Sequence, residues 1–349
     1  MPVSDPHPPR TARHAAPLDR YAVLGHPVAH SQSPFIHAEF ARQTGQALHY
    51  GRLDCPPDGF EATLRRFIAS GAPAADPSTE LGGDAGAHPR GYASAQPRVD
   101  ATTILGPVRG CNITVPFKFQ VLPLARHATA RATLAQAANT LRLDDNGWLA
   151  DNTDGIGLVR DIQDHAALAL AGQRVLLIGA GGAAAGVLGP LMAAGCAAIT
   201  VANRTVSRAQ ALVQRHAGWA DRHGSTLAAT GLGDCGEAFD LVINSSASSL
   251  AGGPVPVGPQ VLRPGTLAVD LMYGPAARPF LDWARLHGAT GRDGLGMLVE
   301  QAAEAFLLWR GVLPHTPPVL AALRERLAHQ THPRLQLPAD SLTTPAARG

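Results

Sequence analysis

The sequence carries a glycine-rich motif of the kind that binds the phosphates of a dinucleotide. Residues 179–184 read GAGGAA; an apolar run at 174–178, which predicts a strand, precedes them, and a predicted helix follows. In this G-x-G-x-x-A pattern Gly179 permits a tight turn, Gly181 lets the backbone approach a pyrophosphate, and the helix N-terminus offers free N–H groups. The motif predicts a dinucleotide site. The alternative is a glycine-rich turn used only for packing.

Residues 203–208 (NRTVSR), after the next predicted strand, bear on the choice of dinucleotide. An NAD enzyme usually has an acidic residue here that accepts hydrogen bonds from the ribose 2′-hydroxyl. This chain has Asn203 and then Arg204, with Arg208 one helical turn further on. Guanidinium groups pair with a 2′-phosphate, which a carboxylate would repel. The sequence therefore favours NADP; the alternative is a pair of arginines on a solvated helix start.

Lys118 is the one lysine among 29 basic residues. Arginine stays protonated, whereas lysine can lose its proton when its surroundings lower its pKa. A single retained lysine suggests proton transfer. The count alone fits equally well with compositional drift that left one lysine behind.

Alternating elements must position these residues. From residue 174 onward, predicted strands at 174–178, 198–202, 240–243 and 267–270 alternate with predicted helices at 182–194 and 205–216. This pattern is typical of a doubly wound parallel sheet in an α/β fold. The other expected elements are a strand at 21–25, a serine-capped helix from Ser33, a helix at 58–69, a strand from Cys111 that stops at Pro116, a helix at 128–138, a hairpin at 140–149, a helix at 156–165, a long helix after Gly296 and a helix at 317–328.

Composition bounds the function classes. The chain has 349 residues, enough for about two domains, with 45% hydrophobic and 16% charged residues and a net charge of +2. This balance predicts neither a nucleic-acid partner nor a basic membrane-binding surface. The uncharged stretch 175–203 is interrupted by glycines, so a buried strand–helix–strand explains it better than a membrane span.

Cysteine and histidine spacing predicts no metal site. Cys55, Cys111, Cys196 and Cys235 form no CxxC pair, and the fifteen histidines include no HExxH motif. Four separated cysteines indicate reduced thiols in a cytoplasmic protein. Residues 1–17 and 331–349 are expected to be disordered tails. Residues 72–106 are expected to be a mobile insertion, which we interpret as a passive loop; the alternatives are a segment that covers the site or one that mediates assembly.

Seven motifs together resemble the shikimate dehydrogenase family, in its order and close to its spacing, across roughly residues 20–328. They are SQSP at 31–34, NITVPFK at 112–118, ANT at 138–140, DNTDG at 151–155, GAGG at 179–182, NRTVSR at 203–208 and DGLGMLVEQ at 293–301. The resemblance implies NADPH-dependent reduction of 3-dehydroshikimate to shikimate. It also implies two α/β domains with a cleft between them: a substrate-binding catalytic domain of residues 18–153 plus 293–330, and an NADP-binding Rossmann domain of residues 154–292.

The resemblance also assigns residue roles. Lys118 and Asp154 are implied as the catalytic pair, in which the ammonium stabilises the developing alkoxide and donates its proton while the carboxylate holds it. The implied substrate contacts are Ser31, Ser33, Asn112, Thr114, Asn139, Asp154, Tyr273 and Gln301. The implied cofactor contacts are Gly179, Ala180, Gly181, Gly182, Ala183, Asn203, Arg204, Thr205, Arg208, Gly294 and Met297.

Simpler interpretations of several residues stay open. Asp154 could cap the helix that begins at Gly155, Ser31 and Ser33 could cap the helix after them, and Gln301 could be a polar residue on a helix flank. The stretch from Asn244 (NSSASS) departs from the family's usual Asn-Ala-Thr-Ser form, where the nicotinamide half of the cofactor is expected to pass.

Three other functions compete. An NAD-dependent quinate/shikimate dehydrogenase is disfavoured by the serine pair and by residues 203–205, and a dehydrogenase of the related folate or amino-acid type by the set of Lys118, Asp154 and the serines. A non-catalytic dinucleotide-binding regulator would be expected to have lost the reacting pair. The predicted partners are small molecules only, in a monomer or homodimer.

Overall fold

The computed structural model describes residues 17–70, 104–246 and 253–331, and it contains two six-stranded sheets. The first sheet has the order β2-β1-β3-β5-β6-β4. Its strands are β1 Leu18–Gly25, β2 Leu48–Asp54, β3 Leu105–Ile113, β4 His127–Ala128, β5 Thr140–Asp144 and β6 Gly147–Asp151. β1 pairs in parallel with β2 and β3, whereas β5 runs antiparallel to β3 and β6, so this sheet is mixed.

The second sheet is parallel throughout, in the order β12-β11-β10-β7-β8-β9. Its strands are β7 Arg174–Ile178, β8 Ala198–Ala202, β9 Thr226–Thr230, β10 Leu241–Asn244, β11 Leu267–Asp270 and β12 Thr290–Arg292. Counted from β7, this is the strand order 3-2-1-4-5-6 of a Rossmann sheet, which binds ligands at the carboxyl ends of its strands. The predicted α/β class with a doubly wound second sheet is therefore confirmed.

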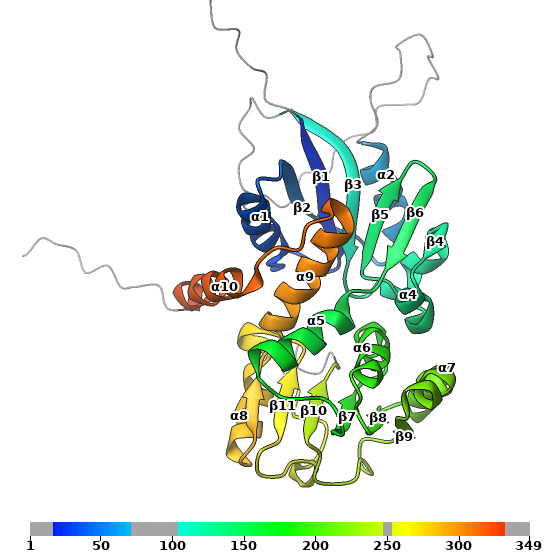
Figure 1. Ribbon diagram of the computed structural model, residues 1–349, viewed down its shortest axis with the longest axis vertical. Helices are drawn as coiled ribbons and strands as arrows, with labels where there is room; N and C mark the ends of the chain where they lie inside the picture. The colour runs from blue at the N-terminus through cyan, green and yellow to red at the C-terminus, as the bar shows by residue number, and fades with distance from the viewer. Residues whose placement is uncertain (1–16, 71–103, 247–252, 332–349) are drawn as a thin grey trace, which may run out of the picture.

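Helices surround and connect the sheets (Figure 1). They are α1 Ser33–Thr44, α2 Phe60–Ala69, α3 Lys118–Val121, α4 Ala130–Ala135, α5 Asp154–Arg160, α6 Gly182–Ala193, α7 Val206–His223, α8 Arg278–Leu286, α9 Leu295–Arg310 and α10 Thr316–Thr331. The short helices are η1 Leu122–Leu124, η2 Asp161–His165, η4 Pro259–Val261 and η5 Gly274–Ala276. α1, α7 and α9 each end at a glycine in the left-handed conformation, which only glycine adopts without steric cost.

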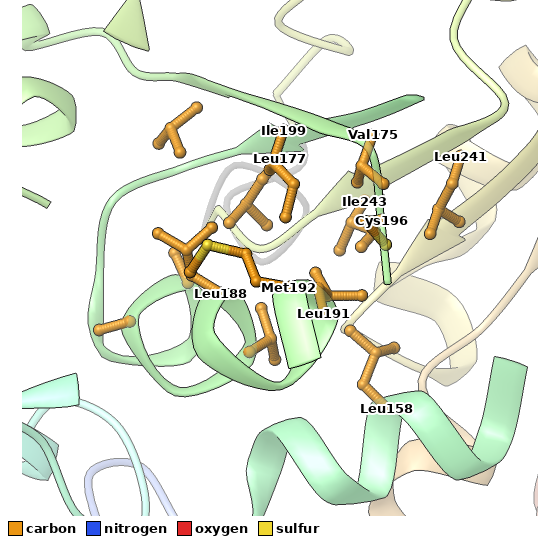
Figure 2. Close-up of a cluster of buried hydrophobic side chains, with 14 of the residues drawn as sticks. Leu158, Val175, Leu177, Leu188, Leu191, Met192, Cys196, Ile199, Leu241 and Ile243 are labelled. Atoms are coloured by element: carbon orange, nitrogen blue, oxygen red, sulfur yellow. The ribbon is translucent and has the colours of Figure 1, made fainter. Parts of the chain in front are cut away.

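The apolar run of β7 is explained by burial on both faces. Val175 and Leu177 point to one core cluster and Leu176 and Ile178 to another, because successive side chains of a strand face opposite sides. Figure 2 shows the first of these clusters, in which the α6 side chains pack under the sheet. Each such side chain contributes roughly 1.5–3 kcal/mol by leaving water.

α5 and α9 lie between the two sheets (Figure 1). Glycines permit the close helix packing there. A Cβ on Gly155 would lie 2.3 Å from Cγ of Pro190 in α6, and a Cβ on Gly157 would lie 2.6 Å from the backbone nitrogen of Gln301 in α9. α5 therefore reaches both neighbours with its backbone, and its first residue is Asp154.

Several element predictions needed correction. β3 begins at Leu105, inside the predicted insertion, because residues 105–110 pair with β1. Ser33 is the first helical residue of α1 and makes no cap, since the capping position belongs to Gln32. The sequence patterns also missed β2, β9, α8 and β12. The predicted tails and insertion otherwise lie almost wholly outside the described residues.

Two expected absences can be examined in the described part of the chain. No helix there is long and apolar enough to cross a membrane. No group of three or more His, Cys, Asp or Glu side chains is placed to hold a metal ion within residues 17–70, 104–246 and 253–331.

Candidate active site

Lys118 and Asp154 form a nearly buried ion pair between the sheets. The Nζ atom of Lys118 lies 2.6 Å from Oδ2 of Asp154, with side-chain exposures of 13% and 5%. Lys118 begins α3 just after β3, and Asp154 begins α5 just after β6. The pair therefore joins the carboxyl ends of two strands, 36 positions apart in sequence.

Asn139 orients the Asp154 carboxylate. Its Nδ2 group donates to Oδ1 of Asp154 at 2.8 Å, which leaves Oδ2 for the lysine. The same amide contacts Oε1 of Gln301 at 3.1 Å and Oγ1 of Thr153 at 2.9 Å, and its carbonyl accepts from the Thr153 backbone N–H. The position of Asp154 is thus set by β5, β6 and α9 together, and its carboxylate serves the lysine rather than capping a helix.

The two serines lie on the turn between β1 and α1. The Ser31 hydroxyl donates to Oγ of Ser33 at 3.2 Å and accepts from the Ser33 backbone N–H at 3.3 Å. Ser31 therefore makes the turn contact that we expected of a capping residue. Ser33 is buried, and its side chain lies near the Tyr50 hydroxyl.

Tyr50 joins the serine turn to β3. Its hydroxyl donates to Oδ1 of Asn112 at 2.6 Å, and burial raises the pKa of this phenol well above its usual value. The Asn112 side-chain amide donates in turn to the backbone carbonyl of Asn139 at 3.2 Å and to Oγ1 of Thr140 at 3.0 Å. One network of hydrogen bonds thus runs from Tyr50 through Asn112 and Asn139 to Asp154.

Two further predicted substrate residues lie beside this network. Thr114 follows β3, and its side chain packs against Gly25 at the end of β1, where an added Cβ would lie 2.2 Å from Thr114 Cγ2. Tyr273, after β11, lies near the Gln32 backbone in the serine turn, and burial raises its pKa. The second sheet therefore contributes a side chain to the serine side of the site.

The glycine turn opens toward Lys118. Gly179 has φ +110°, a left-handed conformation, and its N–H donates to the Ala202 carbonyl at 2.8 Å. A Cβ on Gly181 would meet no described atom within 4 Å, whereas one on Gly182 would lie 3.1 Å from the Lys118 Cβ. The backbone between Gly179 and Gly182, with Ala180 and Ala183, fits a pyrophosphate at the N-terminus of α6, next to Lys118.

Two arginines lie exposed just after β8. Arg204 and Arg208 are exposed, and neither is paired with an acidic group of the described residues. Asn203 donates its Nδ2 to the Thr205 carbonyl at 2.8 Å, which shapes the start of α7. Because β8 lies beside β7, this end of the sheet adjoins the glycine turn.

Gly294 and Met297 occupy the opposite side of the glycine turn. A Cβ on Gly294 would lie 2.4 Å from the carbonyl oxygen of Leu271, so α9 begins directly against the end of β11. Met297 is buried in the core cluster against which Ala180 packs. Both residues lie on the side where the nicotinamide is expected, Gly294 through its backbone and Met297 as a buried core side chain.

Comparison with known proteins gives one family. Residues 23–74 and 96–141 match the profile described as shikimate dehydrogenase substrate binding domain, residues 161–251 that of shikimate / quinate 5-dehydrogenase, and residues 294–324 that of shikimate 5'-dehydrogenase C-terminal domain. A protein of Methylibium petroleiphilum named shikimate dehydrogenase (NADP(+)) is 58% identical over 89% of this chain and 95% of its own length. The chain belongs to the shikimate dehydrogenase family.

Solved structures agree with this assignment to the shikimate dehydrogenase family. A shikimate 5-dehydrogenase from Thermus thermophilus, in complex with NADP(H) and shikimate, is 27% identical with a TM-score of 0.66, covering 88% of this chain and 99% of that one. An enzyme named Ael1 from Pseudomonas putida is 37% identical with a TM-score of 0.69, covering 87% and 98% of the two chains. A protein of Acidovorax sp. with the same printed name as the Methylibium protein is 53% identical over 90% of this chain and 98% of its own.

Residues that the sequence analysis missed also belong to this family member's candidate site. Tyr50, Arg52 and Thr153 all contact predicted substrate residues. Tyr50 and Arg52 lie on β2, which had no assigned strand pattern, and only the pairing of β2 with β1 brings them to the serine turn. Their spacing of two places both side chains on one face of the strand, but the sequence LHYGRLD has no apolar alternation that would have signalled a strand.

The unusual Asn244-Ser245-Ser246 segment has a local structural role. The Ser245 hydroxyl donates to the Ile178 carbonyl at 2.7 Å, and a Cβ on Gly179 would lie 2.7 Å from that hydroxyl oxygen. Asn244 donates to Asp270 at 3.0 Å, which ties β10 to β11. Ser245 thus packs against the glycine turn and supports its conformation. Residues 247–252 of the same stretch lie outside the described residues.

Proposed function

We propose that this chain catalyses the reversible NADPH-dependent reduction of 3-dehydroshikimate to shikimate, a step of the shikimate pathway toward chorismate and the aromatic amino acids. The observation that carries the proposal is the nearly buried pair of Lys118 and Asp154, with Nζ and Oδ2 2.6 Å apart, placed against Gly182 of the phosphate-binding turn. The amine proposed to donate the proton therefore lies next to the turn proposed to bind the cofactor.

The chain's own residues account for the proton. An ammonium group has three N–H donors, and Asp154 accepts from one of them. Another can stabilise the negative charge that develops on the ketone oxygen and then protonate it. Asn139 holds the other carboxylate oxygen, so Asp154 keeps its orientation while the lysine transfers its proton. NADPH, when bound, supplies the hydride.

The other assigned residues bind and orient. Ser31, Ser33, Asn112, Thr114, Asn139, Tyr273 and Gln301 form our proposed substrate set, since a small hydroxylated acid requires many short polar partners. Gly179, Ala180, Gly181, Gly182 and Ala183 form the proposed pyrophosphate turn, with Gly294 and Met297 at the nicotinamide side. Asn203, Arg204, Thr205 and Arg208 form the proposed 2′-phosphate site, whose uncompensated positive charge supports NADP.

We further propose a division of labour along the chain. Residues 18–153 with 293–330 would act as the substrate-binding catalytic domain and 154–292 as the cofactor domain. The enzyme would work in the cytoplasm as a monomer or homodimer. Cys55, Cys111, Cys196 and Cys235 are all unpaired and buried, which fits a reducing compartment.

Spectrophotometry of NADPH formation tests the proposal. Purified protein with shikimate and NADP is expected to form NADPH, at a kcat/KM well above that with quinate and NAD. A higher kcat/KM for quinate with NAD would replace the proposal with the NAD-dependent quinate/shikimate alternative. No turnover of either pair, with retained NADP binding, would favour a non-catalytic dinucleotide-binding protein.

A further inference from the structure

Arg52 places a guanidinium group behind the serine turn. It lies on β2, and its Nε and Nη2 atoms donate to the Ser31 carbonyl at 2.9 and 2.6 Å. The side chain is partly buried, and its guanidinium group lies close enough to Tyr50 and Tyr273 to interact electrostatically with both. Arg52 is thus held on the same side of the site as Ser31 and Ser33.

Among the described residues, no acidic group balances the charge of Arg52. Its hydrogen bonds go to a neutral carbonyl, its Nη1 atom donates to no described residue, and no described carboxylate forms an ion pair with it. Burial and the nearby Arg326 guanidinium lower the pKa of Arg52. A partly buried cation beside a second cation is unfavourable unless an anion completes the arrangement.

The opposite side of the site offers no such charge. Lys118 is already paired with Asp154, so the reacting end is close to neutral. An anionic substrate group therefore finds its uncompensated positive charge near the serines, on Arg52. A planar guanidinium group suits a carboxylate in particular, because it offers several donors in one plane.

We propose that Arg52 is a specificity-determining residue that selects substrates bearing a carboxylate, by pairing electrostatically with that group when the two serines hold it. This inference rests on the proposed function. It adds that preference for an acid over a neutral polyol comes from one cation on β2, while the proton-transfer machinery at Lys118 works independently of it.

The test compares shikimate with its methyl ester, which keeps the ring hydroxyls but lacks the charge. Kinetics with saturating NADP are measured for wild type and for Arg52→Gln. Loss of a charge-assisted hydrogen bond is expected to raise KM for shikimate about 10–100-fold with little change in kcat. The methyl ester should be affected far less, so the ratio of kcat/KM between acid and ester should collapse toward one.

A structural role for Arg52 gives a different result. If Arg52 only holds the Ser31 carbonyl, the variant loses activity toward acid and ester in the same proportion, and the proposal is overturned. An unchanged KM for shikimate overturns it as well. Arg52→Lys, which keeps the charge, is expected to retain most of the preference for the acid. Arg42 is an exposed arginine paired with Glu39, and Arg42→Gln is expected to leave the KM and kcat for both substrates unchanged.

A measurement on the wild-type enzyme removes dependence on folding of the variant. Added salt should lower kcat/KM for shikimate but not for the methyl ester, because only the acid is attracted by an unpaired cation. Equal salt effects on both substrates contradict the proposal. Wild-type protein that turns over neither substrate with NADP would instead refute the proposed function itself, so the two failures are distinguishable.

Discussion

The backbone of Gly182 lies directly against the side chain of Lys118. A Cβ at position 182 would be 3.1 Å from the Lys118 Cβ and 3.5 Å from its Cδ. Gly182 belongs to the glycine turn that we propose binds the pyrophosphate and Lys118 to the segment after β3, so this contact couples that turn to the proposed proton donor. Because residue 182 has no side chain, the glycine turn and the Lys118 side chain can lie in direct contact.

Gly182→Ala is therefore expected to lower kcat. The added methyl group must displace the lysine stem by a few tenths of an ångström, and misplacement on this scale costs up to about tenfold in rate. Steady-state kinetics and circular dichroism would measure the loss and check the fold. Gly218→Ala is the matched control, since a Cβ there meets no described atom within 4 Å, and it should leave kcat unchanged. Equal kcat values for the two variants would refute the coupling.

Lys118→Ala should lower kcat by about 10²-fold or more, as for removal of a positioned general acid. NADP binding, followed by fluorescence titration, should persist, because the proposed phosphate-binding groups are the backbone of residues 179–183 and the arginines after β8. Lys118→Arg keeps the positive charge but holds its proton too tightly to donate it, so a substantial loss is expected there too. Wild-type turnover by Lys118→Ala would remove this residue from the mechanism.

Replacing Arg204 and Arg208 together by glutamine should change the cofactor preference. Loss of charge-assisted hydrogen bonds is expected to raise KM for NADP about 10–100-fold while leaving KM for NAD nearly unchanged. Kinetics with both cofactors at saturating shikimate would measure the change. Arg222→Gln, near the other end of α7, is the control and should keep the preference for NADP. A parallel rise for both cofactors would mean that the arginines act on folding.

His37 predicts a pH-dependent stability. It is fully buried, stacks on Tyr50 at a centroid distance of 4.2 Å, and neither ring nitrogen has a hydrogen-bond partner in the described structure. Burial lowers its pKa from 6.5 to about 3. Below pH 6.5 the unfolded chain binds a proton at this residue that the folded chain does not bind until about pH 3. The free energy of unfolding should therefore fall as the pH decreases through this window, by at most about 1.4 kcal/mol per unit.

His37→Phe should remove this contribution, because phenylalanine does not titrate. Urea unfolding at pH 7, 6 and 5 is expected to show a smaller loss of stability on acidification for His37→Phe than for wild type. The exposed His287→Gln variant should follow the wild-type profile. Parallel profiles for wild type and His37→Phe would show that the histidine is hydrated or protonated in the folded protein.

The local patterns were sufficient for part of this protein. The apolar run of β7, the glycine turn after it and the two arginines after β8 are contiguous in sequence, and their roles depend on backbone conformation and on immediate neighbours. Strand–helix alternation likewise depends on hydrophobic period, so the parallel sheet followed from it. β2, β9 and β12 escaped because they are short, partly exposed strands with few buried side chains, whereas α8 has a clear apolar face with Phe280 and Ala284 that was simply not assigned. Ser33 escaped its assigned cap because helix ends shift by a residue.

Only the tertiary structure decided how distant residues meet. The resemblance paired Lys118 with Asp154, but their contact depends on β3 and β6 ending at the same edge and on glycines that let α5 pack against α6 and α9. Tyr50 and Arg52 reach the serine turn only because β2 pairs in parallel with β1. The sequence determines interactions between residues that are close along the chain. Contacts such as Asn139 with Gln301, 162 positions apart, form only once the sheets and helices have packed.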